Sequence, residues 1–137
     1  MSTHPVSRSD ALNQIVSREL SNAGASRSAS VDILDELLDH GFTRDELFRL
    51  VVPRRTLARR RHAGEQLAPE ESDRAVRLAR ITALAERVFG EDAKAYAWLR
   101  EPSRTLSGQV PLDLLRTETG AQLVEQTLHR IDFGMLA

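Results

Sequence analysis

Pro53 stands where one expected helix ends and another begins, and this boundary constrains the fold more than any other feature of the chain. Upstream, Thr43 and Glu46 have the spacing of a capping box, which predicts a helix that begins near Arg44. The residue before a proline is pushed out of the helical region, so this helix should end near Leu50. Proline itself suits the first position of the next helix, because its missing N–H needs no partner there. Two helices joined by a tight turn indicate a helix-turn-helix.

The second of these helices carries a concentrated positive charge. Residues 53–62 contain five arginines, and residues 41–62 contain seven arginines against two acids, whereas residues 30–40 contain four acids and no lysine or arginine. Guanidinium groups bind both phosphate oxygens and guanine edges, so the segregated charge favours a helix that reads DNA. The alternative is a solvated helix whose arginines pair with the acids upstream. On the charge pattern, the candidate DNA-binding residues are Arg44, Arg54, Arg55, Arg59, Arg60 and Arg61.

The overall charge is close to neutral, at −1, so no global field would draw the chain to nucleic acid. DNA binding would then depend on the local patch and on more than one copy, which predicts a homodimer that meets pseudo-palindromic half-sites. The absence of cysteine excludes a disulfide framework and thiolate metal sites. No apolar run is long enough to span a membrane, and the polar start is not a secretory signal. We expect a cytoplasmic protein with no membrane partner.

Apolar residues recur at helical spacing through most of the chain, and no segment alternates at period two over the length of a strand, which predicts an all-α fold. A small polar run over residues 21–30 is typical of a linker, so the first thirty residues look accessory. A narrow seam on the longest expected helix consists of Ala75, Leu78, Thr82, Ala85 and Phe89. Helices are expected over residues 10–20, 31–40, 44–50, 53–63, 69–89, 91–100 and 118–131, with a loop over 101–110 and a helical turn at 111–115.

The residue types that carry catalysis or bind metals form no recognisable motif in this chain. The four histidines are widely separated and form no ligand pair, so no metal site is expected. There is no nucleophile elbow, phosphate-binding loop or dinucleotide-binding loop. Glu70, Glu71 and Asp73 stand at the start of a helix, where acids are most simply partners of the helix dipole. The sequence therefore favours a protein that is not an enzyme and needs no cofactor. The histidines are His4, His40, His62 and His129.

A second conspicuous stretch begins at the only tryptophan, Trp98. For this side chain we favour core packing over contact with a partner. Pro102, Gly108 and Pro111 shape the backbone that follows, and Pro111 also opens a short apolar turn over residues 112–115. That turn needs a cover. Either the last helix supplies it or a partner protein does, because contiguous exposed apolar surface usually marks an interface.

Many of these residues fall into one ordered pattern that runs from about Gly41 to the C-terminus. The pattern consists of Arg54-Arg55-Thr56-Leu57-x-Arg59-Arg60, Gly64, Pro69-Glu70-Glu71-Ser72-Asp73-Arg74, Arg77-Leu78-Ala79-Arg80, Phe89-Gly90, Ala97-Trp98-Leu99, Pro102, Leu106, Gly108, Pro111-Leu112, Thr117, Gly120, Val124-Glu125, Leu128, Arg130-Ile131 and Gly134. With these residues the chain resembles the Xre/MbcA/ParS family of type II antitoxins.

The resemblance implies an N-terminal Xre-like helix-turn-helix domain followed by a small helical toxin-binding domain. It also implies a cognate RES-domain toxin that consumes NAD, an antitoxin whose C-terminal part blocks the active site of that toxin, and repression of the shared operon through operator DNA. We therefore expect an accessory segment and linker over residues 1–29, the DNA-binding domain over residues 30–84 and the toxin-binding domain over residues 85–137.

The family's motifs fall on particular residues of this chain. Its helix-turn-helix motif falls on Arg54, Arg55, Thr56, Arg59 and Arg60. Its toxin-binding motif falls on Trp98, Pro102, Leu106, Gly108 and Pro111, to which we add the adjoining Leu112.

The last residues of the chain are unusually apolar for a terminus. Residues 131–137 end in apolar side chains and a free carboxylate, which suits a plug for a pocket that holds an anionic dinucleotide. Packing back onto its own domain is the alternative, and the residues alone leave both open. The candidate toxin-binding residues at this end are Arg130, Phe133, Gly134, Met135, Leu136 and Ala137.

The leading hypothesis is thus an antitoxin that neutralises a toxin by binding it and regulates its own operon. A stand-alone helix-turn-helix regulator without a toxin partner is the second hypothesis, and a small enzyme is the third. A toxin gene in the neighbouring reading frame would favour the first over the second. Hydrolytic activity of the purified chain alone would favour the third.

Overall fold

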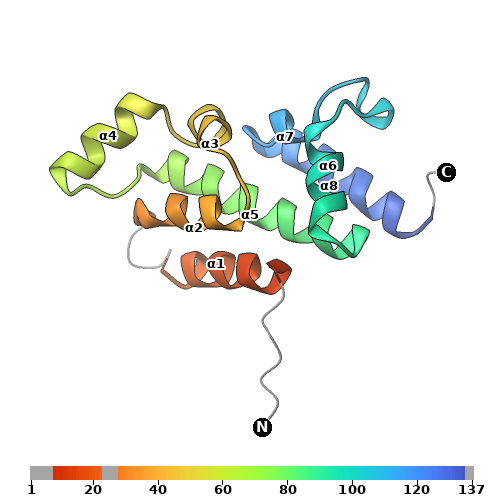
Figure 1. Cartoon of the computed structure of the whole chain (residues 1–137), viewed down its shortest axis with the longest axis horizontal. Coiled ribbons are helices and arrows are strands. Elements are labelled where there is room, and N and C mark those ends of the chain that lie inside the picture. Colours follow the sequence, from red (N-terminus) through yellow and green to blue (C-terminus); the bar gives the residue numbers. More distant parts are fainter. Residues whose placement is uncertain (1–7, 23–27, 135–137) are drawn as a thin grey trace, which may run out of the picture.

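A computed structural model describes residues 8–22 and 28–134 of the chain, and in this described part all regular elements are helices. The all-α prediction is confirmed. Figure 1 shows α5 running through the middle, with α1 and α2 along one side of it, α3 and α4 towards one end, and α6 to α8 towards the other. The elements are α1 (Arg8–Asn22), α2 (Asp32–His40), α3 (Arg44–Leu50), α4 (Arg54–Ala63), α5 (Pro69–Phe89), α6 (Asp92–Arg100), the 3₁₀ helix η1 (Arg104–Leu106), α7 (Pro111–Leu114) and α8 (Glu118–Asp132).

The long helix α5 is the centre of the hydrophobic core. Residues 81–86 are buried on every side of the helix, so the buried surface is much wider than the narrow seam that the sequence predicted. The reason is that three helices, α1, α6 and α8, all pack against α5. Small side chains such as Ala79 and Ala83, both buried, let these neighbours approach closely.

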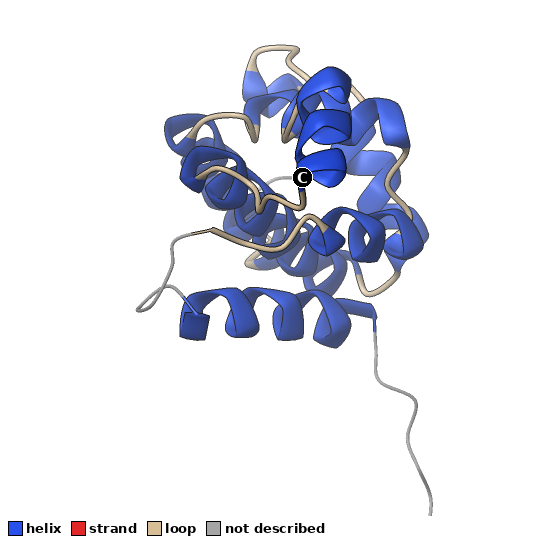
Figure 2. Cartoon of the chain, turned by 90° about the vertical axis from the view of Figure 1, so that its left-hand side faces the viewer, coloured by secondary structure: helices blue, strands red, loops and turns tan. Residues whose placement is uncertain are grey.

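The first helix belongs to this core. Leu12, Ile15 and Val16 are buried, and Figure 2 shows α1 as a layer along the remaining helices. The segment that follows it is also fixed at Ala29, whose N–H donates to Ser72 Oγ at 2.8 Å and whose carbonyl accepts from Leu67 N–H at 3.0 Å. Sequence patterning did not predict that α1 would be integral to the fold. The domain limits at residues 29 and 84 remain predictions, and α5 runs without a break through residue 84.

Local signals set the helix ends that were predicted from the sequence. The Thr43 hydroxyl accepts a hydrogen bond from Glu46 N–H at 3.1 Å, and the Glu46 carboxylate accepts one from Thr43 N–H at 2.9 Å, which confirms the capping box. Pro53 lies one position before the first residue of α4, at the N-cap, one residue earlier than expected. At the start of α5 the Glu71 carboxylate accepts from Ala68 N–H at 2.7 Å, as expected of an acid in a first turn.

The C-terminal part contains a structured loop followed by the packed helices α7 and α8. The loop over residues 101–110 contains η1 and closes through an isolated bridge between Ser103 and Gln109. Behind it, α8 packs directly on α7 at Gly120. A Cβ atom at Gly120 would overlap the carbonyl oxygen of Leu114, so only glycine permits this approach. The last helix therefore supplies cover for the apolar turn at residues 111–115, in which Leu112 and Leu115 are buried.

Candidate DNA-binding helix and partner surface

Helix α4 presents an exposed cationic surface. None of its ten residues, all within the described part of the chain, is buried, and Figure 1 shows α4 at the edge of the molecule. Arg54, Arg55 and Arg59 are exposed and make no ion pair with any of the described residues. Thr56 is half-buried beside them. The three arginines are thus available to an external anion.

Two other arginines of α4 attach this helix to the rest of the fold. Arg60 is only 16% exposed in its side chain; its Nε lies 2.9 Å from Glu71 Oε1, and it also pairs with Glu65 at 3.3 Å. Arg61 pairs with Asp35 of the acidic helix α2 at 3.1 Å. Pairing with an upstream acid, the alternative to DNA binding, is therefore found for Arg61, whereas Arg60 pairs with acids that follow it in the chain. Segregation of charge in the sequence could not separate these two arginines from the three outward ones.

The first helix of the helix-turn-helix is joined to the C-terminal part at both ends. Near its start, Glu46 accepts two hydrogen bonds of 2.9 Å from Arg100, which also donates to the carbonyl oxygen of Gly41 at 2.9 Å. Near its end, Arg49 pairs with Asp113 of α7. Burial alone would raise the pKa of the Glu46 carboxyl, but the bonds from Arg100 and Thr43 outweigh burial and hold this pKa below its ordinary value.

The residues of the predicted toxin-binding motif differ in their exposure in the structure. Leu106, Pro111 and Leu112 are buried, so they can act only by shaping the surface above them. Pro102 and Gly108 are exposed on the loop. Trp98 is half-buried, with its ring centroid 5.7 Å from that of Phe89, so part of its surface is core and part is open.

The end of α8 exposes apolar surface. Phe133 is 76% exposed, and Arg130 and Gly134 beside it are exposed as well. Leu123, on the same helix, is 47% exposed and was not identified from the sequence. It lies next to Val124 but off the buried stripe of α8, and an apolar residue outside a helical stripe is the signal that could have revealed it. Met135, Leu136 and Ala137, predicted as part of a plug, lie outside the described residues.

One buried polar pair was not predicted. His40 and Glu86 lie in the core with side chains 2.8 Å apart, Nε2 to Oε1. A helical pattern places His40 at the end of α2, but its partner on α5 is 46 residues away and leaves no local signal. Within the described residues no group of histidine and acidic side chains could hold a metal ion. No helix among them has the length and apolarity to cross a bilayer.

Both halves of the chain match domains of known proteins. Residues 21–80 match the antitoxin Xre-like helix-turn-helix domain, and residues 84–134 match the antitoxin Xre/MbcA/ParS C-terminal toxin-binding domain. A protein named Antitoxin Xre from Pseudomonas putida is 44% identical over 84 residues, which cover 61% of this chain and 53% of that protein. The chain therefore spans about half the length of this relative.

Two further relatives extend the comparison. A protein named Antitoxin Xre from Yersinia enterocolitica is 36% identical over 111 residues, which cover 79% of this chain and 75% of that protein. A protein from a Sphingobium strain, named Prs ADP-ribosylating antitoxin, is 32% identical over 83 residues, which cover 54% of this chain and 52% of that protein.

Proposed function

The chain belongs to the Xre/MbcA/ParS family of antitoxins, and we propose that it binds and inhibits a cognate RES-type, NAD-consuming toxin in the cytoplasm and represses its own operon as a DNA-binding homodimer. It acts by binding rather than by catalysis. The observation that carries the DNA-binding part is a set of three arginines on the exposed helix α4, Arg54, Arg55 and Arg59, which form no ion pair with the residues that the structure describes.

Helix α4 has the features that a recognition helix needs. It follows α3 through a tight turn, it begins directly after Pro53, and its outward arginines can reach phosphates and guanine edges. Arg60 and Arg61 hold it in place from behind, so they serve recognition by positioning. Because the net charge is only −1, two copies on adjacent half-sites would be needed for firm binding.

The toxin-binding part is supported by the exposed apolar surface of α8. A side chain as large as Phe133, at 76% exposure, loses apolar contact with water when a partner covers it. Leu123 and the exposed Pro102 offer further surface of this kind. We propose that the end of α8 and the residues after it cover the toxin's active site.

The chemistry of the partner is proposed from the family and from one relative. The name of the Sphingobium relative refers to ADP-ribosylation. NAD is the ADP-ribosyl donor in that reaction. A toxin that binds NAD has a pocket for an anionic dinucleotide. An apolar segment with Arg130 beside it can contact the walls and the anionic groups of such a pocket.

Coexpression with the product of the adjacent gene tests this function. The proposal expects the two proteins to purify together, the chain to restore growth of cells that express the toxin, and the complex to lose NAD-consuming activity. Phe133→Asp should weaken the rescue, whereas Gln122→Asp, which adds the same charge at another exposed position of α8, should leave it intact. If neither variant restores growth, or if both variants restore it equally, the result contradicts the proposed surface.

A stand-alone transcriptional regulator remains the second candidate function. It is favoured by the complete helix-turn-helix, which needs no toxin to account for it. A genome in which no toxin gene adjoins this one, together with operator binding by the chain alone, would support that candidate.

A further inference from the structure

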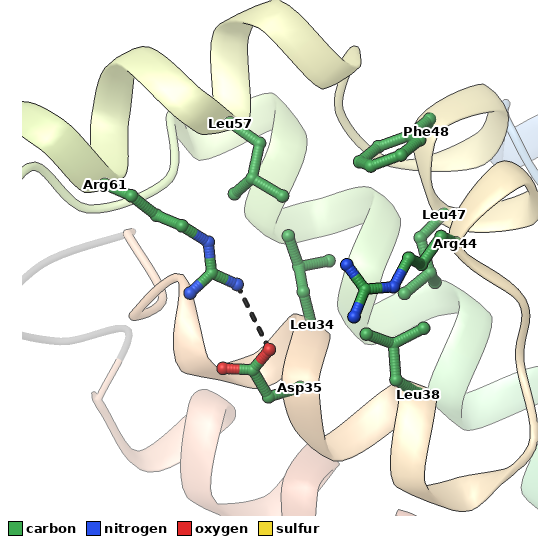
Figure 3. A pocket seen from close by; sticks show the side chains of 8 residues that line it. All are labelled: Leu34, Asp35, Leu38, Arg44, Leu47, Phe48, Leu57 and Arg61. Atoms are coloured by element: carbon green, nitrogen blue, oxygen red, sulfur yellow. Dashed lines mark hydrogen bonds and ion pairs between the residues drawn. The ribbon is translucent and has the colours of Figure 1, made fainter.

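A hollow of about 320 Å³ lies between α2, α3 and α4, beneath the helix proposed to read DNA (Figure 3). Five of the eight side chains that line it are apolar, and the other three are charged. Leu34 and Leu38 come from α2, Leu47 and Phe48 come from α3, and Leu57 comes from α4. This volume lies at the lower end of the range for small-molecule sites, which combine apolar walls with a few polar groups.

The walls differ in how firmly they are held. Leu34 and Leu47 are buried in the core and form a fixed floor. Leu38, Phe48 and Leu57 are only half-buried, so they keep apolar surface that a ligand could cover. The hollow thus offers an apolar body both a rigid base and uncovered sides.

The rim carries an excess of positive charge. Arg44 is exposed and makes no ion pair with any residue that the structure describes, and Figure 3 shows its guanidinium group on the opposite side of Leu34 from that of Arg61. Arg61 pairs with Asp35 at 3.1 Å, but both side chains are well exposed, at 39% and 54%, and such surface pairs contribute little to stability. Two guanidinium groups against one carboxylate leave one net positive charge for a ligand.

We propose that this hollow binds a small amphipathic carboxylate, a molecule with one carboxylate group and an apolar body that fits a volume of about 320 Å³. The apolar body lies on Leu34, Leu47 and Phe48. The carboxylate accepts hydrogen bonds from Arg44, and Arg61 turns towards it from Asp35. Guanidinium groups match carboxylates in geometry as well as in charge, which selects this head group over a neutral one.

Another hollow, between α1 and α2, does not have this selectivity. It measures about 430 Å³ and is lined mostly by polar side chains of both signs. Its arginine, Arg18, already pairs with Glu36 at 2.9 Å, and Asp39 adds a further negative charge. An anion would be repelled there.

Occupation of the hollow bears on α4 because that helix has no buried residue and is attached to the fold through ion pairs, of which the Arg61–Asp35 pair lies at the rim of the hollow. A ligand that covers Leu57 and engages Arg61 contacts α4 from beneath and replaces its pair with Asp35. The angle of the helix then depends on whether the ligand is bound. On the proposed DNA-binding function, which this step rests on, the ligand changes the affinity for DNA.

Calorimetric titration of the full chain with octanoate, and in parallel with octan-1-ol, tests the site. We expect saturable binding of octanoate, with octan-1-ol weaker by about tenfold because it cannot pair with a guanidinium group. Arg44→Gln should lower octanoate affinity by a similar factor, whereas Arg87→Gln, an exposed arginine of α5 outside the hollow, should leave it unchanged. Equal affinity for the two probes, or an unchanged octanoate affinity in Arg44→Gln, would overturn the proposal.

Fluorescence anisotropy with a labelled DNA duplex tests the effect of the ligand on DNA binding separately from binding of the ligand itself. Octanoate should change the DNA affinity of the unmodified chain. Because Arg44 is itself a candidate DNA contact, the affinity of Arg44→Gln is first measured without octanoate, and octanoate should leave that value unchanged. If octanoate binds while the DNA affinity stays the same, the proposed effect of the ligand on DNA binding is wrong. If the duplex does not bind with or without octanoate, the proposed DNA-binding function fails, and the calorimetric result decides the site independently.

Discussion

Arg100, the last residue of α6, donates two hydrogen bonds of 2.9 Å each to the carboxylate of Glu46 in the first turn of α3. This contact joins the C-terminal part of the chain to the helix-turn-helix. The Arg100 guanidinium also lies over the ring of Tyr96, 4.8 Å from its centroid. Glu46 meanwhile caps the backbone at Thr43. One carboxylate thus fixes both the start of α3 and its contact with α6.

Loss of this pair should destabilise the whole fold. Arg100→Ala leaves the Glu46 carboxylate, 8% exposed as a residue, without its charged partner. Removing one partner of a buried pair costs about 3–5 kcal/mol, and because the Arg100 side chain is 37% exposed we expect a smaller loss of about 1–2 kcal/mol in the free energy of unfolding. Urea denaturation measures it. Arg104→Ala, at an exposed position of η1, is the control and should unfold at the same urea concentration as the unmodified protein.

The same carboxylate predicts a dependence of stability on pH. The pKa of Glu46 is lowered in the folded chain, since the bonds from Arg100 and Thr43 outweigh the effect of burial. Its ionised form therefore adds stability at pH values above the ordinary glutamate pKa, about 4.3, and this contribution is lost as the pH falls through the lower folded value. Glu46→Gln should be less stable than the unmodified protein at neutral pH, and the difference should shrink on acidification. A difference that stays constant from neutral to acidic pH would contradict this assignment.

Local signals made the helix boundaries predictable. Thr43 with Glu46, Pro53 and Gly90 each act within a few residues of chain, and each stands at or within one position of the expected place. The all-α fold and the exposed basic helix followed from such signals together with charge segregation. These properties depend on neighbours in sequence and can be read from one chain.

Properties that depend on distant neighbours were not predictable in the same way. Arg60 and Arg59 are adjacent in a run of like residues, but Arg60 meets Glu71 and Arg59 faces outward, and nothing in the run distinguishes them. The core role of Leu12 and the pairing of His40 with Glu86 depend on how α1 and α2 pack against α5. Leu106 and Leu112 match a toxin-binding motif, yet they are buried beneath the surface that a partner could touch.

The position of Trp98 predicts an intermediate effect on stability. Its ring packs against Phe89 with centroids 5.7 Å apart, but the side chain is only half-buried. Full removal of a buried aromatic side chain costs about 3–5 kcal/mol, so we expect Trp98→Ala to lower the free energy of unfolding by about 2–3 kcal/mol. Trp98→Phe, which keeps an aromatic ring beside Phe89, should recover most of the loss. Thermal unfolding of both variants checks the order, and equal melting temperatures for Trp98→Ala and the unmodified protein would show that the ring does not support the fold.

The arginines of α4 should separate DNA affinity from stability. Arg55 and Arg59 are exposed and unpaired with the described residues, so their replacement by alanine should leave the melting temperature unchanged. If either side chain reads a base, the same change should weaken operator binding by about 1–3 kcal/mol, and if it meets only a phosphate the salt dependence should become shallower. Arg60→Ala should instead lower the melting temperature, because it leaves Glu71, 6% exposed, without its cationic partner.

Gel-shift assays and thermal unfolding on the three variants give the comparison. Because the single changes are at nearly adjacent positions of one helix and each removes one positive charge, a general loss of electrostatic attraction would weaken DNA binding equally in all three. A selective loss of affinity in Arg55→Ala and Arg59→Ala at full stability identifies the outward face as the contact surface. Unchanged affinity in both would remove the outward face of α4 from the DNA interface and leave these arginines as part of a solvated helix surface.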